Sequence, residues 1–353
     1  METRYETILE EDLDSQRAQA VLKDAGAIIK RGGLVAFPTE TVYGLGADAL
    51  QEEACRKIYE AKGRPSDNPL IVHIGKWEDI YPITRELPEQ AKVLADAFWP
   101  GPLTMILKKS DLVPMRTTGG LDTVAVRMPS HKVARDFILQ SGGYIAAPSA
   151  NRSGRPSPTL ARYVQEDMDG RIEMIIDGGQ VGIGLESTIV DLTEGNPVIL
   201  RPGYITREML EEVLGNVDVD KTILDGNSKQ APKAPGMKYR HYAPKADLTI
   251  VAGEEDKVVA TINARTKEAQ REGKKVGIIS TDHTRKRYVG DSVKNAGSRE
   301  NEETIARELF RILREFDDEN VDVIYSESFD ENGIGQAIMN RLLKAAGHHI
   351  EYI

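Results

Sequence analysis

The sequence predicts an α/β protein with a large twisted mixed sheet and flanking helices, followed by a small parallel α/β unit. Over residues 1–214, many short apolar runs alternate with only a few helical patterns, which is typical of a mixed sheet with helices packed on it. From residue 247, strand and helix patterns alternate, which indicates a parallel sheet. Because 353 residues exceed what one core usually supports, we expect two domains, at 1–214 and 246–353, joined by a linker over 215–245.

The first helix is predicted from apolar residues at the 3.6-residue period between Ala18 and Ile29, with Asp14 or Ser15 as its N-cap. A buried strand follows over 34–37 and ends at Pro38, because proline has no N–H to donate to a sheet. Further helices are expected over 52–61, 88–98, 130–140 and 206–214. Further strands are expected over 70–74, 103–108, 122–128, 144–147, 173–177, 188–192 and 197–201.

Residues 39–46 have the composition of a ligand-binding loop. Polar side chains come first, at 39–41, and Gly44 and Gly46 then allow the backbone to bend or to approach a ligand closely. Lys62 and Arg64, with one glycine between them, follow the next helix, and His73 lies in the strand beyond. Paired cations beside a hydroxyl-rich loop suit an anionic, polar ligand. A purely structural interpretation is also open, because cations near a helix C-terminus complement the helix dipole.

Hydroxyl and arginine side chains recur at strand ends along the first 200 residues. They occur over 147–159, at 186–188 and at 201–203, and Thr123 and Arg127 share one predicted strand. Each group alone is typical of an ordinary surface turn. Together they indicate a ligand site at the sheet edge, where α/β proteins build such sites.

No phosphate-binding loop of the Walker type is present. Residues 179–188 have glycines at a similar spacing, but Leu185 occupies the lysine position and Glu186 would repel a triphosphate. If a nucleotide binds, separate loops must hold it.

The linker has an unusual composition. Between Ser228 and Lys245 the chain has no acidic residue, several prolines and a cluster of aromatic and basic side chains. A proline-rich spacer is one interpretation. We favour a basic strap that lies over an anionic site, because a spacer does not need Met237, Tyr239, His241 and Tyr242 together.

The C-terminal pattern is a small parallel α/β, or Rossmann-like, domain. Its strands are expected over 248–251, 276–280 and 321–325, and its helices over 256–272, 302–316 and 333–346. Fold alone assigns no activity to it.

Composition excludes several classes of protein. The formal net charge of −10 disfavours broad nucleic-acid or anionic-membrane binding. The single cysteine, Cys55, excludes a disulfide framework and a multi-cysteine zinc site, and core packing is its expected role. Residues 1–11 lack the pattern of a secretory signal, and the longest apolar runs are too short to span a bilayer. We therefore expect a cytoplasmic protein with no membrane partner.

Several ordered motifs resemble the YrdC-type threonylcarbamoyl-AMP synthase family in its long, two-domain form. They are PTETVYGLG at 38–46, KGRPSDNPL at 62–70, WPGPLT at 99–104, SANRSG at 149–154, ESTIVD at 186–191, RPG at 201–203, PGMKYRHYAP at 235–244 and GIGQAIMNRL at 333–342. The resemblance implies a YrdC-like catalytic domain followed by an accessory domain. It also implies a reaction in which L-threonine, bicarbonate or CO₂, and ATP give L-threonylcarbamoyl-adenylate and pyrophosphate.

The resemblance also implies residue roles. Lys62 and Arg64 are expected to be catalytic, by clamping phosphates. The residues expected to face ATP are Arg64, Asn68, Thr123, Ser149, Ser157, Arg201 and, from the strap, Tyr242. The residues expected to hold threonine are Thr41, His73, Arg127, the backbone at Ala147, and Ser187, with Arg127 suited to the carboxylate.

The implied cofactor is Mg²⁺ carried by ATP, with no metal ligand assigned to the protein. The implied partner is a separate transferase that passes the product to the adenosine beside the anticodon of certain tRNAs, so contact with tRNA is indirect. An RNA-binding module of the same fold, without adenylate formation, is the alternative; the acidic charge and the lack of interleaved aromatics count against it. A carbamoyl-transfer maturation protein that embeds this domain would need cysteine-rich zinc modules, and one cysteine excludes them.

Overall fold

The computed structural model describes residues 1–220, 234 and 241–353 of the chain, which divides into two compact units. Unit 1 comprises Met1–Ser153, Ser157–Gly182 and Glu186–Lys238. Unit 2 comprises Tyr239–Ile353 together with two short segments from earlier in the chain, Gly154–Pro156 and Ile183–Leu185. The sequence pattern did not indicate these two segments as part of the C-terminal domain.

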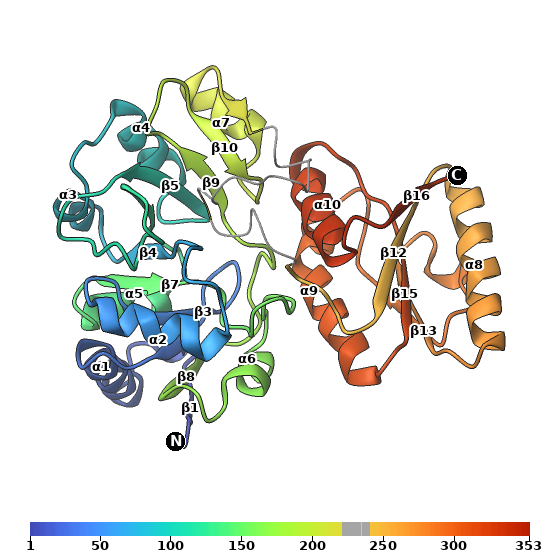
Figure 1. The fold of residues 1–353 in the computed structure, drawn as a ribbon, viewed down its shortest axis with the longest axis horizontal. Coiled ribbons are helices and arrows are strands. Elements are labelled where there is room, and N and C mark those ends of the chain that lie inside the picture. Colours follow the sequence, from blue (N-terminus) through green and yellow to red (C-terminus); the bar gives the residue numbers. More distant parts are fainter. Residues whose placement is uncertain (221–233, 235–240) are drawn as a thin grey trace. The chain divides into compact units, whose positions relative to one another are not determined.

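Unit 1 is built on a mixed sheet that has 11 strands within the described residues, in the order β1-β8-β2-β3-β7-β4-β6-β5-β9-β10-β11 (Figure 1). The strands are β1 (Arg4–Thr7), β2 (Val35–Phe37), β3 (Gly44–Asp48), β4 (Ile71–Ile74), β5 (Leu103–Lys108), β6 (Thr123–Arg127), β7 (Tyr144–Ala147), β8 (Met174–Asp177), β9 (Thr188–Asp191), β10 (Val198–Arg201) and β11 (Asp218–Val219). The helices are α1 (Gln16–Lys30), α2 (Glu52–Lys62), α3 (Ile80–Ile83), α4 (Glu89–Phe98), α5 (Lys132–Gln140), α6 (Ala161–Met168) and α7 (Arg207–Leu214).

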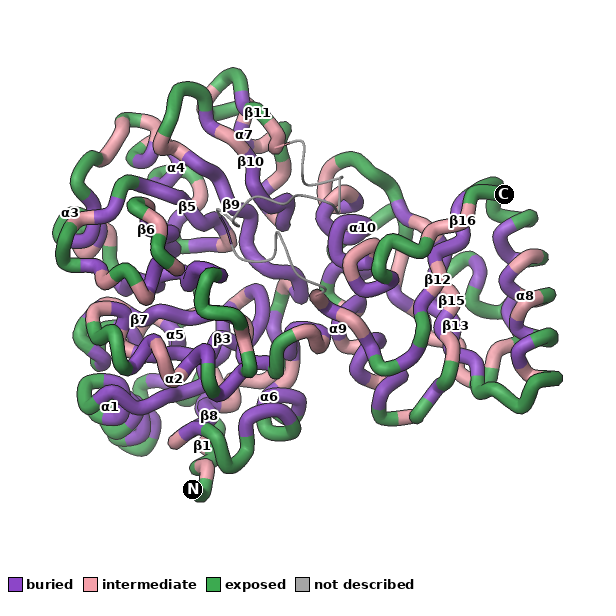
Figure 2. The backbone as a smooth tube through the Cα atoms, in the orientation of Figure 1, coloured by how far each residue is buried: buried purple, intermediate pink, exposed green. Residues whose placement is uncertain are grey.

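The alternation of side chains along each strand gives unit 1 two separate cores. In β2, Val35 and Phe37 pack with α1 and α5, whereas Ala36 between them joins the larger core on the other face, with residues of α2, α4 and α7. Cys55 of α2 is buried in this larger core, and its burial raises the pKa of the thiol to about 11. Figure 2 shows the strands mostly buried and the outer surface of α1 exposed.

Beyond the part covered by α1 and α5, the same sheet face carries only a small apolar cluster among the described residues. Register partners in neighbouring strands point to the same face, and Ile71, Ile106 and Ala125 form a small apolar cluster there with Ile189 and Leu200. Ala234, the one described residue between 221 and 240, is fully buried in the same cluster. The rest of the predicted strap, at 221–233 and 235–240, lies outside the described residues.

Unit 2 contains a parallel sheet of five strands in the order β14-β13-β15-β12-β16. In Figure 1, α8 covers one face of this sheet, and α9 and α10 cover the other. The strands are β12 (Asp247–Ala252), β13 (Val276–Ser280), β14 (Ser292–Asn295), β15 (Val323–Glu327) and β16 (Ile350–Tyr352), and the helices are α8 (Glu255–Arg271), α9 (Glu302–Glu319) and α10 (Gly333–Ala345). Within unit 2, the fully buried Arg314 of α9 donates hydrogen bonds to the Pro156 carbonyl oxygen from Nε (3.0 Å) and Nη2 (2.6 Å).

Several parts of the secondary structure differ from the sequence prediction, and among them β1, α3 and β11 were not predicted. Gly44 and Gly46 belong to β3 rather than to a loop, and a Cβ at either would lie 3.1 Å from the Phe37 ring, so the glycines permit close packing inside the protein and not the approach of a ligand. Helix α6 was not predicted. Neither were the edge strands β14 and β16, the second of which follows His349 directly.

Gly203 offers a test of how tightly the loop before β9 is packed. An added Cβ would lie 2.5 Å from the Thr188 nitrogen and 2.8 Å from the Glu186 carbonyl oxygen. Because these are backbone atoms, we expect Gly203→Ala to lower the free energy of unfolding by about 1–3 kcal/mol. Unfolding in urea can be followed by tryptophan fluorescence, since both tryptophans, Trp77 and Trp99, lie in unit 1.

The matched control is Gly182→Ala, because the nearest atom to a Cβ at Gly182 is 4.0 Å away. That variant should change the free energy of unfolding by less than about 1 kcal/mol. Equal stability losses in the two variants would contradict the packing argument.

Candidate functional site

The register of three neighbouring strands places a row of polar side chains on one face of the unit 1 sheet. His73 of β4 pairs with Arg127 of β6, and Arg127 pairs with Thr104 of β5. Because partners in register share a face, these three side chains are adjacent. The row lies on the same face as the apolar cluster that contains Ala234.

Arg127 connects this row to the loop between β2 and β3. Its guanidinium is 4% exposed, and it donates from Nη1 to Thr41 Oγ1 (2.9 Å) and from Nη2 to Glu40 Oε1 (2.6 Å). Thr39 shapes the loop, because its hydroxyl donates to the Val42 carbonyl oxygen (2.6 Å). The predicted residues Thr41, His73 and Arg127 are therefore brought together.

Glu40 is a member of this site that the sequence prediction did not include. Its side chain is 12% exposed, and its second carboxylate oxygen, Oε2, is buried with no hydrogen-bond partner among the described residues. A buried acceptor without a donor is costly, so such an atom marks a place where a ligand donor fits. A guanidinium and a carboxylate side by side complement the two charged groups of an α-amino acid. The only indication in the sequence was the position of Glu40 in a polar loop.

His73 is neutral at physiological pH. Burial and, second, the neighbouring Arg127 charge lower the pKa of its imidazole to about 3. Nδ1 lies 3.1 Å from the Ile71 carbonyl oxygen, and the ring meets Phe37 edge-on with the centroids 6.0 Å apart. A neutral imidazole adds no second positive charge beside Arg127.

Ser187 and Arg201 extend the row on the side of β5. The Ser187 and Thr104 hydroxyl oxygens are 2.7 Å apart. Arg201 donates to Ser187 twice, from Nη2 to Oγ (3.1 Å) and from Nε to the carbonyl oxygen (3.0 Å). In the preceding residue, the Glu186 carboxylate accepts a 2.5 Å hydrogen bond from Ser157. Three strand-end groups found in the sequence, at 147–159, 186–188 and 201–203, thus meet at one loop.

Lys62 holds the loop that follows β7. Its ammonium is 3% exposed and donates to the carbonyl oxygens of Ser149 and Asn151. The Ser149 hydroxyl donates to the Asn151 side chain (2.5 Å), which closes the loop on itself. Arg64, just beyond α2, donates to the Pro69 carbonyl oxygen (3.1 Å).

Some of the predicted ATP and threonine residues lie at opposite ends of β4 and β6, whereas others lie together, since Arg201 of the ATP set donates to Ser187 of the threonine set. Asn68 precedes β4, and Thr123 begins the parallel β6, so the two lie at one end. His73 and Arg127 lie at the other end, and Thr123 and Arg127 are about 13 Å apart at 3.3 Å per residue. Ala147 of the antiparallel β7 pairs with Ile71, and Ser149 follows at the Asn68 end.

Tyr242 belongs to unit 2, where its ring is buried against Phe310 of α9 with the centroids 5.0 Å apart. The Arg341 guanidinium lies 5.9 Å from the Tyr242 ring. Tyr242 has a positive φ of 64°, a conformation unusual for a residue with a side chain.

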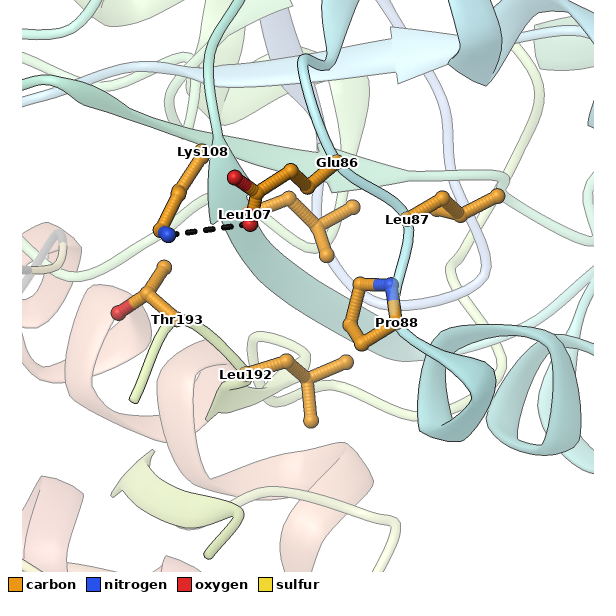
Figure 3. A pocket seen from close by; sticks show the side chains of 7 residues that line it. All are labelled: Glu86, Leu87, Pro88, Leu107, Lys108, Leu192 and Thr193. Atoms are coloured by element: carbon orange, nitrogen blue, oxygen red, sulfur yellow. Dashed lines mark hydrogen bonds and ion pairs between the residues drawn. The ribbon is translucent and has the colours of Figure 1, made fainter. Parts of the chain in front are cut away.

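A separate surface groove of about 290 Å³ lies at the end of β5, and Figure 3 shows its lining. The lining residues are Glu86, Leu87, Pro88, Leu107, Lys108, Leu192 and Thr193. None belongs to the predicted site, and its one charged contact, between Lys108 and Glu86 (3.0 Å), is an exposed ion pair of the kind that contributes little.

The described residues contain no group of three or more His, Cys, Asp or Glu side chains that could hold a metal ion. Within the same residues, every helix is too short or too polar to span a membrane.

The comparisons with known proteins agree with the two-unit architecture. Residues 27–203 match a family model described as "Telomere recombination" (Sua5, YciO, YrdC), and residues 205–347 match one described as "Threonylcarbamoyl-AMP synthase, C-terminal domain". The threonylcarbamoyl-AMP synthase of Pyrococcus abyssi is 52% identical over 332 residues, covering 93% of this chain and 95% of the relative. That of Bacillus subtilis is 51% identical over 330 residues, covering 93% and 94%.

The crystal structure of P. abyssi Sua5 complexed with L-threonine superimposes with a TM-score of 0.93, at 49% identity, and covers 99% of this chain and 100% of that one. Fold and site thus define a YrdC-like α/β protein with an appended parallel α/β unit, as the sequence predicted. The chain belongs to the threonylcarbamoyl-AMP synthase family, in its two-domain Sua5 form.

The low pKa of His73 has a consequence for stability. Between about pH 6.5 and pH 3, the unfolded chain protonates this imidazole and the folded chain does not, so the free energy of unfolding falls as the pH is lowered. The slope contributed by this residue approaches about 1.4 kcal/mol per pH unit. We expect His73→Asn to flatten the stability profile in this range, measured by urea unfolding at several pH values. Parallel profiles for the two proteins would contradict a buried, neutral His73.

Proposed function

We propose that this protein forms L-threonylcarbamoyl-adenylate and pyrophosphate from L-threonine, bicarbonate or CO₂, and ATP. Family membership supports the reaction, and the related Sua5 protein of P. abyssi has been crystallised with L-threonine. The observation that carries the proposal is the buried group of Arg127, Thr41 and Glu40, which complements an amino acid at one end of a polar sheet face.

The Arg127 guanidinium binds the threonine carboxylate at that end, where Thr41, Ser187 and His73 also lie. The Ala147 backbone, which pairs with Ile71 further along β4, completes the proposed threonine contacts. Glu40 Oε2 accepts a hydrogen bond from the threonine ammonium and then its proton, which leaves a free amine. The amine nitrogen forms a bond to the carbon of CO₂ as one C–O π bond opens onto oxygen, and the second proton leaves to solvent water, which gives the carbamate. A base must lie within hydrogen-bond reach of the proton that it accepts, and the Glu40 carboxylate lies within the proposed threonine site.

At the other end, a carbamate oxygen attacks the α-phosphorus of ATP and pyrophosphate leaves. This step requires alignment and neutralised charge more than an activated nucleophile. Arg64 contributes its fork of donors, and Lys62 a point charge that also holds the Ser149 loop in place. The other residues proposed to contact ATP are Asn68, Thr123, Ser149, Ser157 and Arg201.

Magnesium enters this reaction with the triphosphate. The described residues supply no carboxylate cage, so a Mg²⁺ ion held by ATP draws its ligands mainly from phosphate oxygens and water.

The strap over 215–245 is proposed to cover the nucleotide, with Tyr242 closing over it. The burial of Ala234 on the polar face of the sheet supports the first part of this proposal. We further propose that the product passes to a separate transferase acting on tRNA in the cytoplasm. The family comparisons favour this synthase function over an RNA-binding module without adenylate-forming activity.

Arg64→Ala tests the phosphate clamp. We expect the loss of a positioned guanidinium to lower the rate of pyrophosphate release by about 10²-fold or more, because transition-state charge is no longer neutralised. The assay is pyrophosphate release that requires both threonine and bicarbonate. Arg56→Ala is the matched control, since Arg56 is a half-exposed arginine of α2 whose ion pairs among the described residues are with Glu53 and Glu60 of the same helix. Full turnover by Arg64→Ala would remove Arg64 from the clamp.

Glu40→Gln tests the base. The amide has nearly the same shape but accepts no proton, so kcat/KM for threonine should fall by about 10²–10⁴-fold at neutral pH. The deficit should shrink as the pH is raised, because solution then supplies the free amine, while the KM for ATP should change little. A deficit that is independent of pH would show that Glu40 only shapes the loop.

A further inference from the structure

The parallel sheet of unit 2 has a topological switch point between β13 and β15. These strands are neighbours, yet the chain leaves β13 toward β14 on one side and leaves β15, through α10, toward β16 on the other. Connections that diverge in this way leave a crevice outside the carboxyl ends of the strands, where open α/β sheets bind their ligands.

A buried polar cluster fixes the base of this region. Glu327, the last residue of β15, is 1% exposed, and its carboxylate accepts hydrogen bonds from Tyr288 (2.9 Å) and from Thr284, both in the segment after β13. Arg299 adds a third bond, of 2.6 Å. A carboxylate held by this many donors is fixed in position, so it anchors the arginine.

Arg299 is held on one side only. Its Nη2 donates to Glu327 and to the Ser328 carbonyl oxygen (2.9 Å), and the guanidinium lies 5.4 Å from the Phe329 ring centroid. Its Nε and Nη1 have no partner among the described residues, and the side chain is 38% exposed. Because Nε shares its edge of the guanidinium with the occupied Nη2, Nη1 is the nitrogen that can donate outward, and a charged N–H of this kind suits a carboxylate oxygen.

A groove of about 310 Å³ adjoins this guanidinium. It is lined by Arg299, Glu302, Ile305, Ser328, Phe329 and Asp330. Asp330 is exposed, and Glu302 accepts from the Gly335 N–H (2.9 Å). The groove thus combines one positive group and two carboxylates with an apolar base, because Ile305 and Phe329 beneath it are 1% and 6% exposed.

The first strand-to-helix turn of unit 2 argues against a nucleotide. In dinucleotide-binding sheets this turn and the helix N-terminus hold the pyrophosphate. Here the turn leads from Gly253 through Glu254 into α8, whose first residues are Glu255 and Asp256. A Cβ at Gly253 would lie 2.6 Å from the Ile353 carbonyl oxygen, so the C-terminal residue also covers the turn. Negative charge and steric cover both oppose phosphate.

We propose that the groove bounded by Arg299, Phe329 and Asp330 binds a free α-amino acid as its zwitterion. The carboxylate accepts from Nη1 of Arg299. The ammonium lies against Asp330 and Glu302, and the ligand's side chain lies over the edge of the Phe329 ring. This site is separate from the catalytic residues of unit 1 and does not depend on their assignment.

The test is isothermal titration calorimetry of the standard L-α-amino acids against the full-length protein, Arg299→Gln and the control Arg285→Gln. Arg285 is an exposed arginine of the same unit outside the groove. We expect at least one amino acid whose affinity falls about tenfold or more in Arg299→Gln and is unchanged in Arg285→Gln. The 2-hydroxy acid of the same carbon skeleton, which lacks the ammonium, should bind correspondingly more weakly.

Because Arg299→Gln also removes a partner of the buried Glu327, Asp330→Asn is the second variant. It leaves the Glu327 cluster intact and removes the negative charge of Asp330, while the amide oxygen can still accept from Asn332, so it should weaken the binding of the same amino acid. If every amino acid binds both variants as tightly as the unaltered protein, or if none binds at all, the proposal is wrong. Binding of AMP that is lost in Arg299→Gln would also overturn it, because the ligand class would then be a nucleotide.

Discussion

The buried positive charge of Arg127 is the constraint around which the candidate site is organised. A guanidinium that is 4% exposed has lost nearly all its water, and such a charge is tolerated only when paired and hydrogen-bonded. Glu40 supplies the opposite charge and Thr41 a hydroxyl oxygen, so the loop between β2 and β3 is tied to β6 without a ligand. His73 must remain neutral beside this charge, as its lowered pKa reflects. The buried charge of Arg127 thus fixes the orientation of the loop between β2 and β3, keeps His73 neutral and requires the opposite charge of Glu40.

The polar residues of the candidate site are positioned by the sheet, and not by a glycine-rich phosphate loop. Each polar residue lies at or next to a strand, and register decides which of them meet: His73, Arg127 and Thr104 share a row, and Ser187 joins it through Thr104. Along β4 and β6, His73 and Arg127 lie at one end, and Asn68 and Thr123 lie at the other. Strands hold these polar side chains rigidly, because the hydrogen bonds between strands fix the spacing between residues that are in register.

Much of this could be predicted from the sequence, because periodicity and strand-end chemistry are local properties. Thr41, His73 and Arg127 were identified from motifs, and the structure groups them. Glu40 was missed because sequence does not show that one carboxylate oxygen is paired and the other buried alone. Gly44 and Gly46 were misread as a loop because the ring of Phe37, which requires their missing side chains, is brought close only by the antiparallel pairing of β2 and β3. The segments Gly154–Pro156 and Ile183–Leu185 join unit 2 through tertiary contacts that no local pattern reveals.

The burial of Cys55 links the reactivity of its thiol to the opening of the main core of unit 1. As the chain's single thiol, fully buried and with its pKa raised to about 11, it presents almost no thiolate to reagents while the main core of unit 1 is closed. Alkylation or oxidation of the Cys55 sulfur therefore requires that the core opens. The reaction rate then depends on how often α2 separates from the sheet. The same burial shields the protein from peroxide and from mixed disulfides, so its redox tolerance follows from its packing.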